Sequence, residues 1–323
     1  MEPSTDVNLA LPWHVGERAV QARLGVFDRM TSVGRRSIRS FMPDQHRAFF
    51  EQLPFLIAGV VDDGGKPQAS VMFGKPGFAR SPDPQTLSIH PSWIDNTVVA
   101  ALKPGASIAL LGIELPTRRR NRMNGRVTAV DEAGFSVAVD QSFGNCVQYI
   151  QRRDYAGAAD PCRPLPPVPF SALDAEAKAL VGRADTFFVA SAAQGENGGV
   201  DVSHRGGRPE FVGIAQDGAI VVPDFAGNRF FNTLGNLTVN PRAGLLFIDF
   251  EQGDLLQLSG TTEIIWEGPQ VRAFRGAERV WRITVTSGNW IRRAWPMKLV
   301  FGEFAPTSLA TGTWAETPVN NGQ

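Results

Sequence analysis

The chain has 323 residues, of which 43% are hydrophobic and 20% charged, and Lys+Arg and Asp+Glu each total 32. This length favours two domains, because single cores rarely grow beyond about 250–300 residues. Formal neutrality argues against nucleic acid or an anionic membrane as a partner. The polar stretch 1–6 has no signal-peptide core, and no run approaches the roughly 20 apolar residues of a spanning helix, so we expect a cytoplasmic protein.

Neither the cysteines nor the histidines form a metal-binding pattern. Cys146 and Cys162 are able to pair in principle, but a chain of this size does not need that bond, and free thiols in a reducing cytosol are expected. His14, His46 and His90 do not stand at metal-ligand spacing from carboxylates or cysteines. No metal site is therefore predicted.

The N-terminal part predicts a helical arm followed by a β-rich domain. Apolar residues at helical spacing predict one amphipathic helix over 15–30, and a second helix is expected to begin at Pro43 and Asp44. Short apolar runs separated by turn residues then predict strands over 55–61, 68–73, 86–90, 107–113, 124–130 and 135–139.

A proline-rich segment precedes a second domain with the same order of elements. Residues 161–169 contain five prolines and predict a stiff, extended linker. Ser171 is then expected to cap a helix, and strands resume at Thr186. Similar residues recur 133 positions apart, as in Ser70 and Ser203, and later 137 apart. This register predicts an internal duplication, with a helical arm over 1–40, a first barrel over 41–160, a linker over 161–169 and a second barrel over 170–323.

The fold class that follows is mainly β with some helix (α+β). About six closely spaced strands in roughly 100 residues have to close, or nearly close, to hide their edges. Each half is therefore expected to be a small β-barrel with short flanking helices.

A polar segment of the second half predicts a phosphate site. Ser203 and Arg205 lie two residues apart on a strand and so face the same side. The chain is then expected to enter a helix near Asn228, where free N–H groups attract phosphate. Arg229, Asn232 and Asn236 follow at the spacing of one helical face, and two arginines add charge. The same residues also fit a polar hairpin turn followed by an ordinary helix cap.

These motifs resemble the pyridoxamine-phosphate-oxidase-related FMN-binding split-barrel family. The segments that carry the resemblance are 201–209, 223–236 and 240–247, with 41–47, 114–122 and 141–150 in the first half. It implies tandem split barrels, noncovalently held FMN and often dimers with flavin at the subunit interface; some relatives bind haem or a deazaflavin. The positions implied to contact the cofactor are Ser203, His204, Arg205, Gly206, Val222, Pro223, Asp224, Asn228, Arg229, Asn232 and Asn236.

Two positions depart from the pattern of this family. Many relatives have proline at His204 and a second arginine at Phe230. The first change puts a titratable group near the flavin, so His204 is a catalytic candidate, although it also fits a simple hydrogen bond to a carbonyl. The second change removes one phosphate-binding charge.

The first half has different residues at the corresponding positions. Met72 stands in place of Arg205, and Asp95 at a helix start repels phosphate, so this barrel is not expected to bind flavin in the same way. The loop 144–146, ahead of an apparent helix through Tyr149, is predicted to cover flavin bound to the second half, with the halves paired as a pseudo-dimer. Cys146 is thus a second catalytic candidate, or else a small buried hydrophobe.

Arg118, Arg119, Arg120 and Arg122 form a dense basic cluster. One interpretation is an exposed edge strand protected by charge. The other is a subsite for an anionic substrate or a surface for an acidic electron-transfer partner.

The function expected from these patterns is that of an FMN-dependent oxidoreductase or flavin reductase component acting on a small molecule. Electrons would come from a reduced nicotinamide, a reductase or a ferredoxin-type donor, and FMN is expected ahead of FAD, deazaflavin or haem. Two alternatives stay open: a non-catalytic flavin or haem carrier or sensor, and a structural protein with a decayed site. A homodimer is compatible with the family. Trp281, Trp290 and Trp295 are expected in the core.

Overall fold

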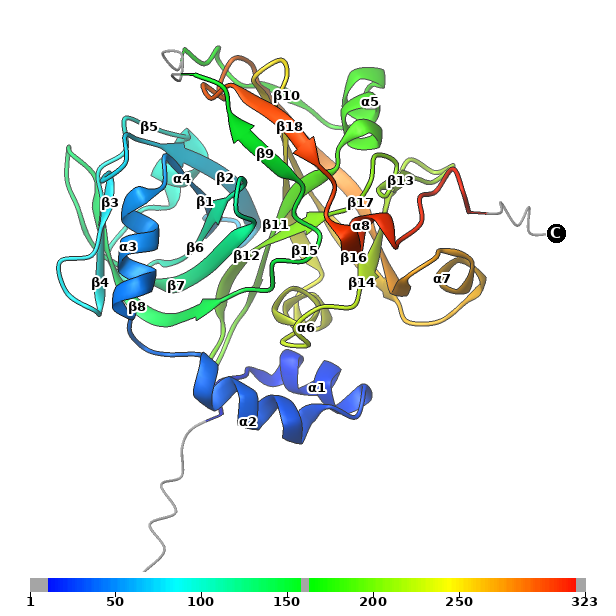
Figure 1. Ribbon diagram of the computed structural model, residues 1–323, viewed down its shortest axis with the longest axis horizontal. Coiled ribbons are helices and arrows are strands. Elements are labelled where there is room, and N and C mark those ends of the chain that lie inside the picture. Colours follow the sequence, from blue (N-terminus) through cyan, green and yellow to red (C-terminus); the bar gives the residue numbers. More distant parts are fainter. Residues whose placement is uncertain (1–10, 158–162, 318–323) are drawn as a thin grey trace, which may run out of the picture.

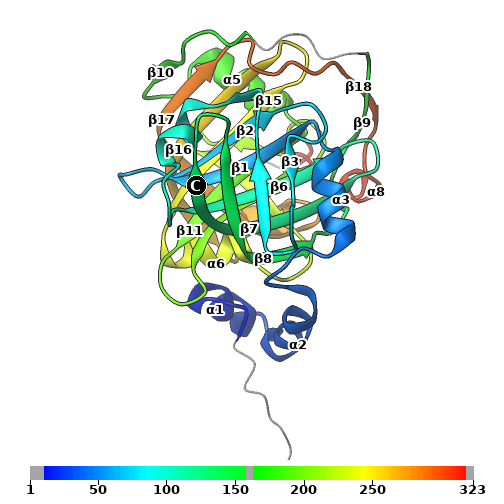
Figure 2. The same cartoon turned by 90° about the vertical axis from the view of Figure 1, so that its left-hand side faces the viewer.

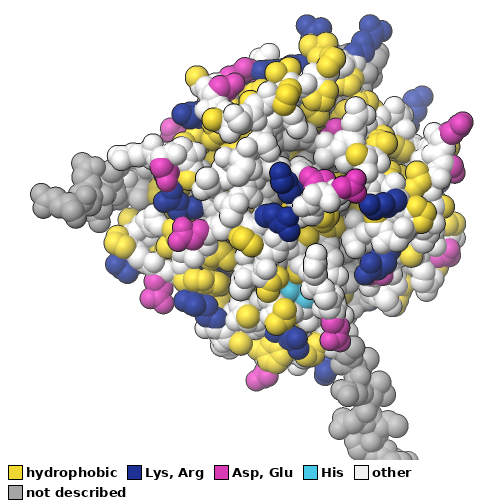
Figure 3. All heavy atoms as spheres, turned by 180° about the vertical axis from the view of Figure 1, so that it is seen from behind, with side chains coloured by type: hydrophobic (Ala, Val, Ile, Leu, Met, Phe, Trp, Pro, Cys, Tyr) yellow, Lys and Arg dark blue, Asp and Glu magenta, His cyan; other side chains and the backbone are white. Residues whose placement is uncertain are grey.

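A computed structural model describes residues 11–157 and 163–317, and Cys162 and Pro161 lie outside them. The fold is mainly β, with two large sheets packed against each other and short helices around them (Figure 1). Within the described residues, no helix is both long and apolar enough to cross a membrane. Basic and acidic side chains are interspersed on the face shown in Figure 3, in keeping with the formal neutrality.

The first sheet has eight strands in the order β3-β4-β8-β7-β6-β1-β2-β5. Its strands are β1 (Phe55–Val61), β2 (Pro67–Phe73), β3 (Ala79–Arg80), β4 (Thr86–Ile89), β5 (Trp93–Ile94), β6 (Ser107–Glu114), β7 (Arg119–Val130) and β8 (Phe135–Gly144). Two helices accompany them, α3 (Asp44–Gln52) and α4 (Asn96–Ala101). The predicted strands are all present, and β7 and β8 extend further than predicted.

The second sheet has the order β12-β11-β15-β16-β17-β14-β13, and β10 also pairs with β17. Its strands are β10 (Val168–Phe170), β11 (Thr186–Ala193), β12 (Gly199–Gly206), β13 (Gly213–Ile214), β14 (Ile220–Phe225), β15 (Arg242–Asp249), β16 (Asp254–Ile265) and β17 (Ala277–Ile291). Its helices are α5 (Ala175–Arg183), α6 (Asn232–Val239), α7 (Pro269–Ala273) and α8 (Pro306–Leu309). Read across the sheet from β12 to β13, these strands occupy the same positions as β2-β1-β6-β7-β8-β4-β3 of the first sheet.

One hydrophobic core lies between the two sheets. Alternate residues of β1 divide between faces: Phe55 and Ile57 point into this shared core, whereas Leu56 points into the core under α3. On the other side, Phe188 of β11 enters the shared core and Phe187 enters the core under α5 and α6. Both faces of the central strands are buried, which explains their continuous apolar sequence.

A small separate sheet also joins the two halves. β9 (Arg152–Tyr155) pairs with β18 (Leu299–Glu303), so the segment that follows the first barrel is hydrogen-bonded to the C-terminal part of the chain. Trp281, Trp290 and Trp295 are buried in the cores, as expected.

The helix predictions for the N-terminal arm and for the cap of α5 were wrong. The arm is not one helix but two, α1 (Val15–Arg23) and α2 (Phe27–Ser37), because Gly25 adopts a left-handed φ of +65° between them. Figures 1 and 2 show both helices below the two sheets, next to α6. The cap of α5 is Asp174, whose carboxylate accepts a hydrogen bond from the Ala177 N–H, rather than Ser171.

Candidate functional site

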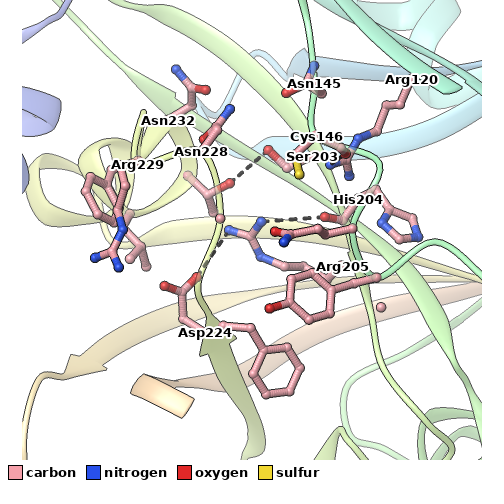
Figure 4. Close-up of a pocket in the computed structure, with 18 of the residues that line it drawn as sticks. Arg120, Asn145, Cys146, Ser203, His204, Arg205, Asp224, Asn228, Arg229 and Asn232 are labelled. Carbon is pink, nitrogen blue, oxygen red and sulfur yellow. Dashed lines mark hydrogen bonds and ion pairs between the residues drawn. The ribbon is translucent and has the colours of Figure 1, made fainter. Parts of the chain in front are cut away.

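A pocket lies where the two halves meet, and both contribute to its wall (Figure 4). From the second half, the predicted residues that line it are Ser203, His204, Arg205, Gly206, Pro223, Asp224, Asn228, Arg229 and Asn232. The first half contributes Arg120, Arg122, Asn145, Cys146, Gln148 and Tyr149. Two predicted positions do not line this pocket: Val222 is buried in the core under α5 and α6, and the Asn236 amide donates hydrogen bonds to Ser191 and Asp201.

Strand β12 presents Ser203 and Arg205 to the pocket and turns His204 the other way. The His204 ring meets Phe188 of the shared core edge-on at 5.6 Å, and in Figure 4 it points away from Arg205. Burial, together with Arg120 and Arg205, holds the pKa of His204 well below its ordinary value. A neutral imidazole on the far face of the strand is a poor proton donor, so the geometry disfavours the proposed acid role of His204.

The helix expected at Asn228 begins four residues later, at Asn232. Arg229 and Phe231 have φ values of +65° and +62°, so the segment before α6 forms an irregular turn, closed by the Asn228 side chain accepting from the Phe230 N–H. Arg229 is thus outside the helical face that carries Asn232. Its guanidinium pairs with Glu278 at 2.5 Å, and in Figure 4 its side chain extends away from Ser203 and Arg205.

The basic cluster is not on an exposed edge, which overturns that interpretation. β7 lies between β6 and β8, and alternation along it directs Arg120 and Arg122 to the pocket. Arg119 points to the opposite side, where its guanidinium lies over the Phe49 ring and donates to the Gln45 carbonyl. Arg118 precedes the strand, with a φ of +59°.

A buried ion pair crosses from the first half to the second beside the pocket. Nη1 of Arg122 donates to Oδ1 of Asp201 at 2.9 Å, and Nη2 donates to the Ser203 hydroxyl. Both charged side chains are more than nine-tenths buried. Asp201 also accepts from the amides of Asn124 and Asn236, both at 2.8 Å, so the carboxylate is well compensated.

Several polar atoms in the pocket wall have no hydrogen-bond partner although they are shielded from solvent. They are Nε of Arg120, Arg122 and Arg205, Nδ2 of Asn145, and both ring nitrogens of His204, which faces the shared core. Buried donors of this kind are nearly always satisfied in proteins, by the chain or by a bound group. A set made of guanidinium and amide donors fits an anion such as a phosphate, held near the start of α6.

The loop between β8 and β9 closes one side of the pocket. The helix expected through Tyr149 and Ile150 is absent, and Tyr149 instead has a φ of +63° in a turn. The Tyr149 ring stacks on Phe225 of β14 at 5.2 Å, and its hydroxyl donates to the Ala226 carbonyl. Cys146 lines the pocket and is only partly buried, so it is not the buried hydrophobe of the alternative interpretation.

The N-terminal arm fixes the turn that precedes α6. Oε1 of Glu17 accepts from the Asn232 amide at 2.5 Å, and Gln21 donates to the Phe230 carbonyl. The Phe230 ring packs against Trp13 at 4.9 Å. α1 approaches α6 closely enough that a Cβ on Gly235 would lie 2.6 Å from the backbone nitrogen of Glu17.

We therefore expect Gly235→Ala to lower the free energy of unfolding by about 1–3 kcal/mol, because the arm has to move away from α6. Gly182 of α5 is the matched control, since a Cβ there meets nothing within 4 Å and alanine favours a helix by up to about 1 kcal/mol. Denaturant unfolding measures both effects, and protease sensitivity of the arm reports its displacement. Equal effects at the two glycines would contradict the close packing.

The corresponding region of the first half is filled by side chains. Asp95 caps α4 and its carboxylate accepts from Ser70 and from Gln257 of the second half. Nearby, Phe73 stacks on Trp93 at 5.3 Å, and Trp295 meets Phe73 edge-on. An acidic, aromatic environment does not suit a phosphate.

The pocket residues of the second half fall within a recognised sequence family. Residues 173–297 match the family model described as pyridoxamine 5'-phosphate oxidase. The second half of the chain is thus similar in sequence to this family. The matched range includes β12, β14 and α6, whereas Arg120, Arg122 and Cys146 lie outside it. No curated protein matches the sequence.

Three solved structures are similar to parts of the chain. HupZ from Group A Streptococcus is 17% identical over 39% of this chain and 98% of its own, with a TM-score of 0.30. A general stress protein 26-related protein of the pyridoxinephosphate oxidase family from Clostridium acetobutylicum is 19% identical over 40% and 92%, with a TM-score of 0.26. MrkH from K. pneumonia, in complex with c-di-GMP, is 12% identical over 78% and 87%, with a TM-score of 0.23. At these TM-scores none of them assigns a ligand or a function.

The sequence predicts the basic side chains of the pocket only in part. A subsite for an anion is one of the two interpretations of the cluster that contains Arg120 and Arg122, and the sequence predicts no contact for Tyr149. The available signal was the alternation of Arg120, Arg122 and Asn124 with buried Met123, which places three polar residues on one face of an inner strand.

Proposed function

We propose that this pocket binds FMN through its phosphate and that the chain is an FMN-dependent oxidoreductase or flavin reductase component. The observation that carries the proposal is the convergence of arginines from both halves, with unsatisfied donors, in front of α6. The relation of residues 173–297 to the pyridoxamine 5'-phosphate oxidase family supports a flavin phosphate over other anions.

In this proposal Ser203, Arg205 and Asn232 hold the phosphate. The Ser203 hydroxyl is already oriented by hydrogen bonds with Arg122 and Thr233, so little ordering is needed when the ligand arrives. Pro223 and the Tyr149–Phe225 pair offer a flat apolar wall beside it. Bound flavin supplies the electron-transfer chemistry, and the protein supplies orientation and electrostatics.

Proton transfer would use a group other than His204, because its ring is neutral and faces the shared core. Cys146, the other catalytic candidate, lines the pocket, and its thiol carries an ionisable proton. Exchange of Cys146 for serine is then expected to alter turnover while leaving flavin affinity unchanged.

The test is an absorption and fluorescence titration of the purified protein with FMN. Wild-type protein is expected to bind stoichiometrically, and Arg205→Ala to weaken binding at least about tenfold, because a charge-assisted contact is worth about 1.5–3 kcal/mol. Arg208→Ala is the matched control: Arg208 lies three residues further on and bonds to Glu316 and the Thr311 carbonyl. Equal losses in both variants, or no binding by the wild type, would reject the flavin site.

Reduction of the bound flavin separates an enzyme from a carrier. Bleaching by NADH, NADPH or a reduced ferredoxin-type donor is expected for an oxidoreductase. A protein that holds flavin tightly but is not reduced by any of these donors is a carrier or sensor. A Soret band in place of flavin absorption would identify haem as the ligand.

A further inference from the structure

The four arginines that line the pocket differ in how their charges are compensated. Arg122 pairs with Asp201 at 2.9 Å, Arg205 lies 3.7 Å from Asp224, and Arg229 pairs with Glu278 at 2.5 Å. Arg120 alone has no carboxylate within 4 Å in the described part of the chain. One positive charge in the wall is therefore uncompensated.

Arg120 is partly buried, and its Nε is shielded from solvent. Nη2 donates to the Cys146 carbonyl at 2.6 Å, and Nε has no partner. Burial, with Arg122 and Arg205 nearby, lowers the pKa of Arg120 to about 9. A partly buried cation without a counter-charge has a desolvation cost, and a bound anion offsets that cost.

The second half lacks the second arginine that the resemblance to the FMN-binding family implies at position 230. Phe230 occupies that position, and its ring is 5% exposed and packed between Trp13 and Phe143 of the first half. Arg229 faces Glu278, so the turn before α6 directs no uncompensated charge toward Ser203. In Figure 4, Arg120 extends from the first half toward Cys146 and Ser203.

We propose that Arg120 of the first half binds the phosphate monoester in this pocket and replaces the missing second arginine at position 230. The inference rests on the proposed function, and it adds that the phosphate is bound by both halves of the chain. The site is then incomplete in the second half alone, although all residues of the family match lie there.

Comparison of the two halves shows that this charge is specific to one site. Arg122 and Gln257, 135 positions apart, make equivalent contacts: Arg122 donates to Ser203 and Asp201, and Gln257 donates to Ser70 and Asp95. In this register, which also aligns the strand bulges at Gly125 and Gly260, Arg120 corresponds to Leu255. Only the pocket in front of α6 thus receives arginines from the opposite half.

The test compares FMN with riboflavin, which lacks the phosphate, in the full-length Arg120→Ala variant. FMN affinity is expected to fall about tenfold or more, while riboflavin affinity stays within about twofold of wild type. Arg119→Ala is the matched control, because Arg119 is adjacent on the strand but faces Gln45 and Phe49. Equal losses for both ligands, or no loss for FMN, overturn the role of Arg120.

A second measurement separates this inference from the flavin proposal. Inorganic phosphate is expected to raise the Tm of the wild type, by mass action on the folded state, and to raise that of Arg120→Ala clearly less, because the variant binds phosphate more weakly. If wild-type protein binds no flavin but shows this difference, the phosphate site stands and the flavin proposal fails. If phosphate shifts both proteins equally, or neither, the inference about Arg120 is rejected.

Discussion

Replacing Arg122 with leucine is expected to lower the free energy of unfolding by about 3–5 kcal/mol, because removing one partner of a buried ion pair leaves the other charge uncompensated. Asp201 would keep the amides of Asn124 and Asn236 but lose the one cation that pairs with it among the described residues. Since Arg122 belongs to the first half and Asp201 to the second, the loss also weakens the contact between the halves.

Denaturant unfolding of Arg122→Leu and of the double variant Arg122→Leu/Asp201→Asn measures this effect. The double variant is expected to recover part of the stability, because the uncompensated charge is gone. Lys103→Ala is the control, since the Lys103–Asp63 pair is largely exposed and worth at most about 1 kcal/mol. A loss of similar size in the control would rule out burial as the cause.

Trp295→Ala is expected to cost about 3–5 kcal/mol of unfolding free energy, the range for deleting a large buried aromatic side chain. Trp295 follows β17 of the second sheet and meets Phe55 and Phe73 of the first edge-on, at 5.0 and 5.3 Å. It is 5% exposed within the shared core.

Thermal and denaturant unfolding of Trp295→Ala, beside Phe41→Ala, check this prediction. Phe41 is 41% exposed, so its removal is expected to change stability by no more than about 0.5 kcal/mol. A single cooperative transition is expected in both variants if the shared core unites the two sheets. Two separated transitions in the wild type would contradict a common core.

The strands were predictable because their apolar runs end at turn residues with strong local preferences. The segment 62–66 between β1 and β2 is such a turn, with Gly65 at a φ of +72°. That Ser203 and Arg205 face the same pocket was predictable for a related reason, since alternation along a strand does not depend on distant contacts.

The beginning of α6 was not predictable from local sequence. The left-handed conformations of Arg229 and Phe231 are maintained by tertiary contacts, with Trp13 on Phe230 and Glu17 on Asn232. The position of β7 inside its sheet is similarly non-local: a run of arginines resembles an exposed edge until Asp201 and the pocket are known to lie opposite. Both errors concern contacts between segments far apart in sequence.

The asymmetry between the two carboxylates that face the opposite half has an evolutionary consequence. In a homodimer, every substitution appears at both symmetry-related positions, so a site and its counterpart have to change together. Here the two equivalent positions are encoded separately: Arg122 at one donates to Asp201, while Gln257 at the other donates to Asp95. One region is therefore free to accumulate charge while the other accumulates aromatic side chains, and selection acts on each independently.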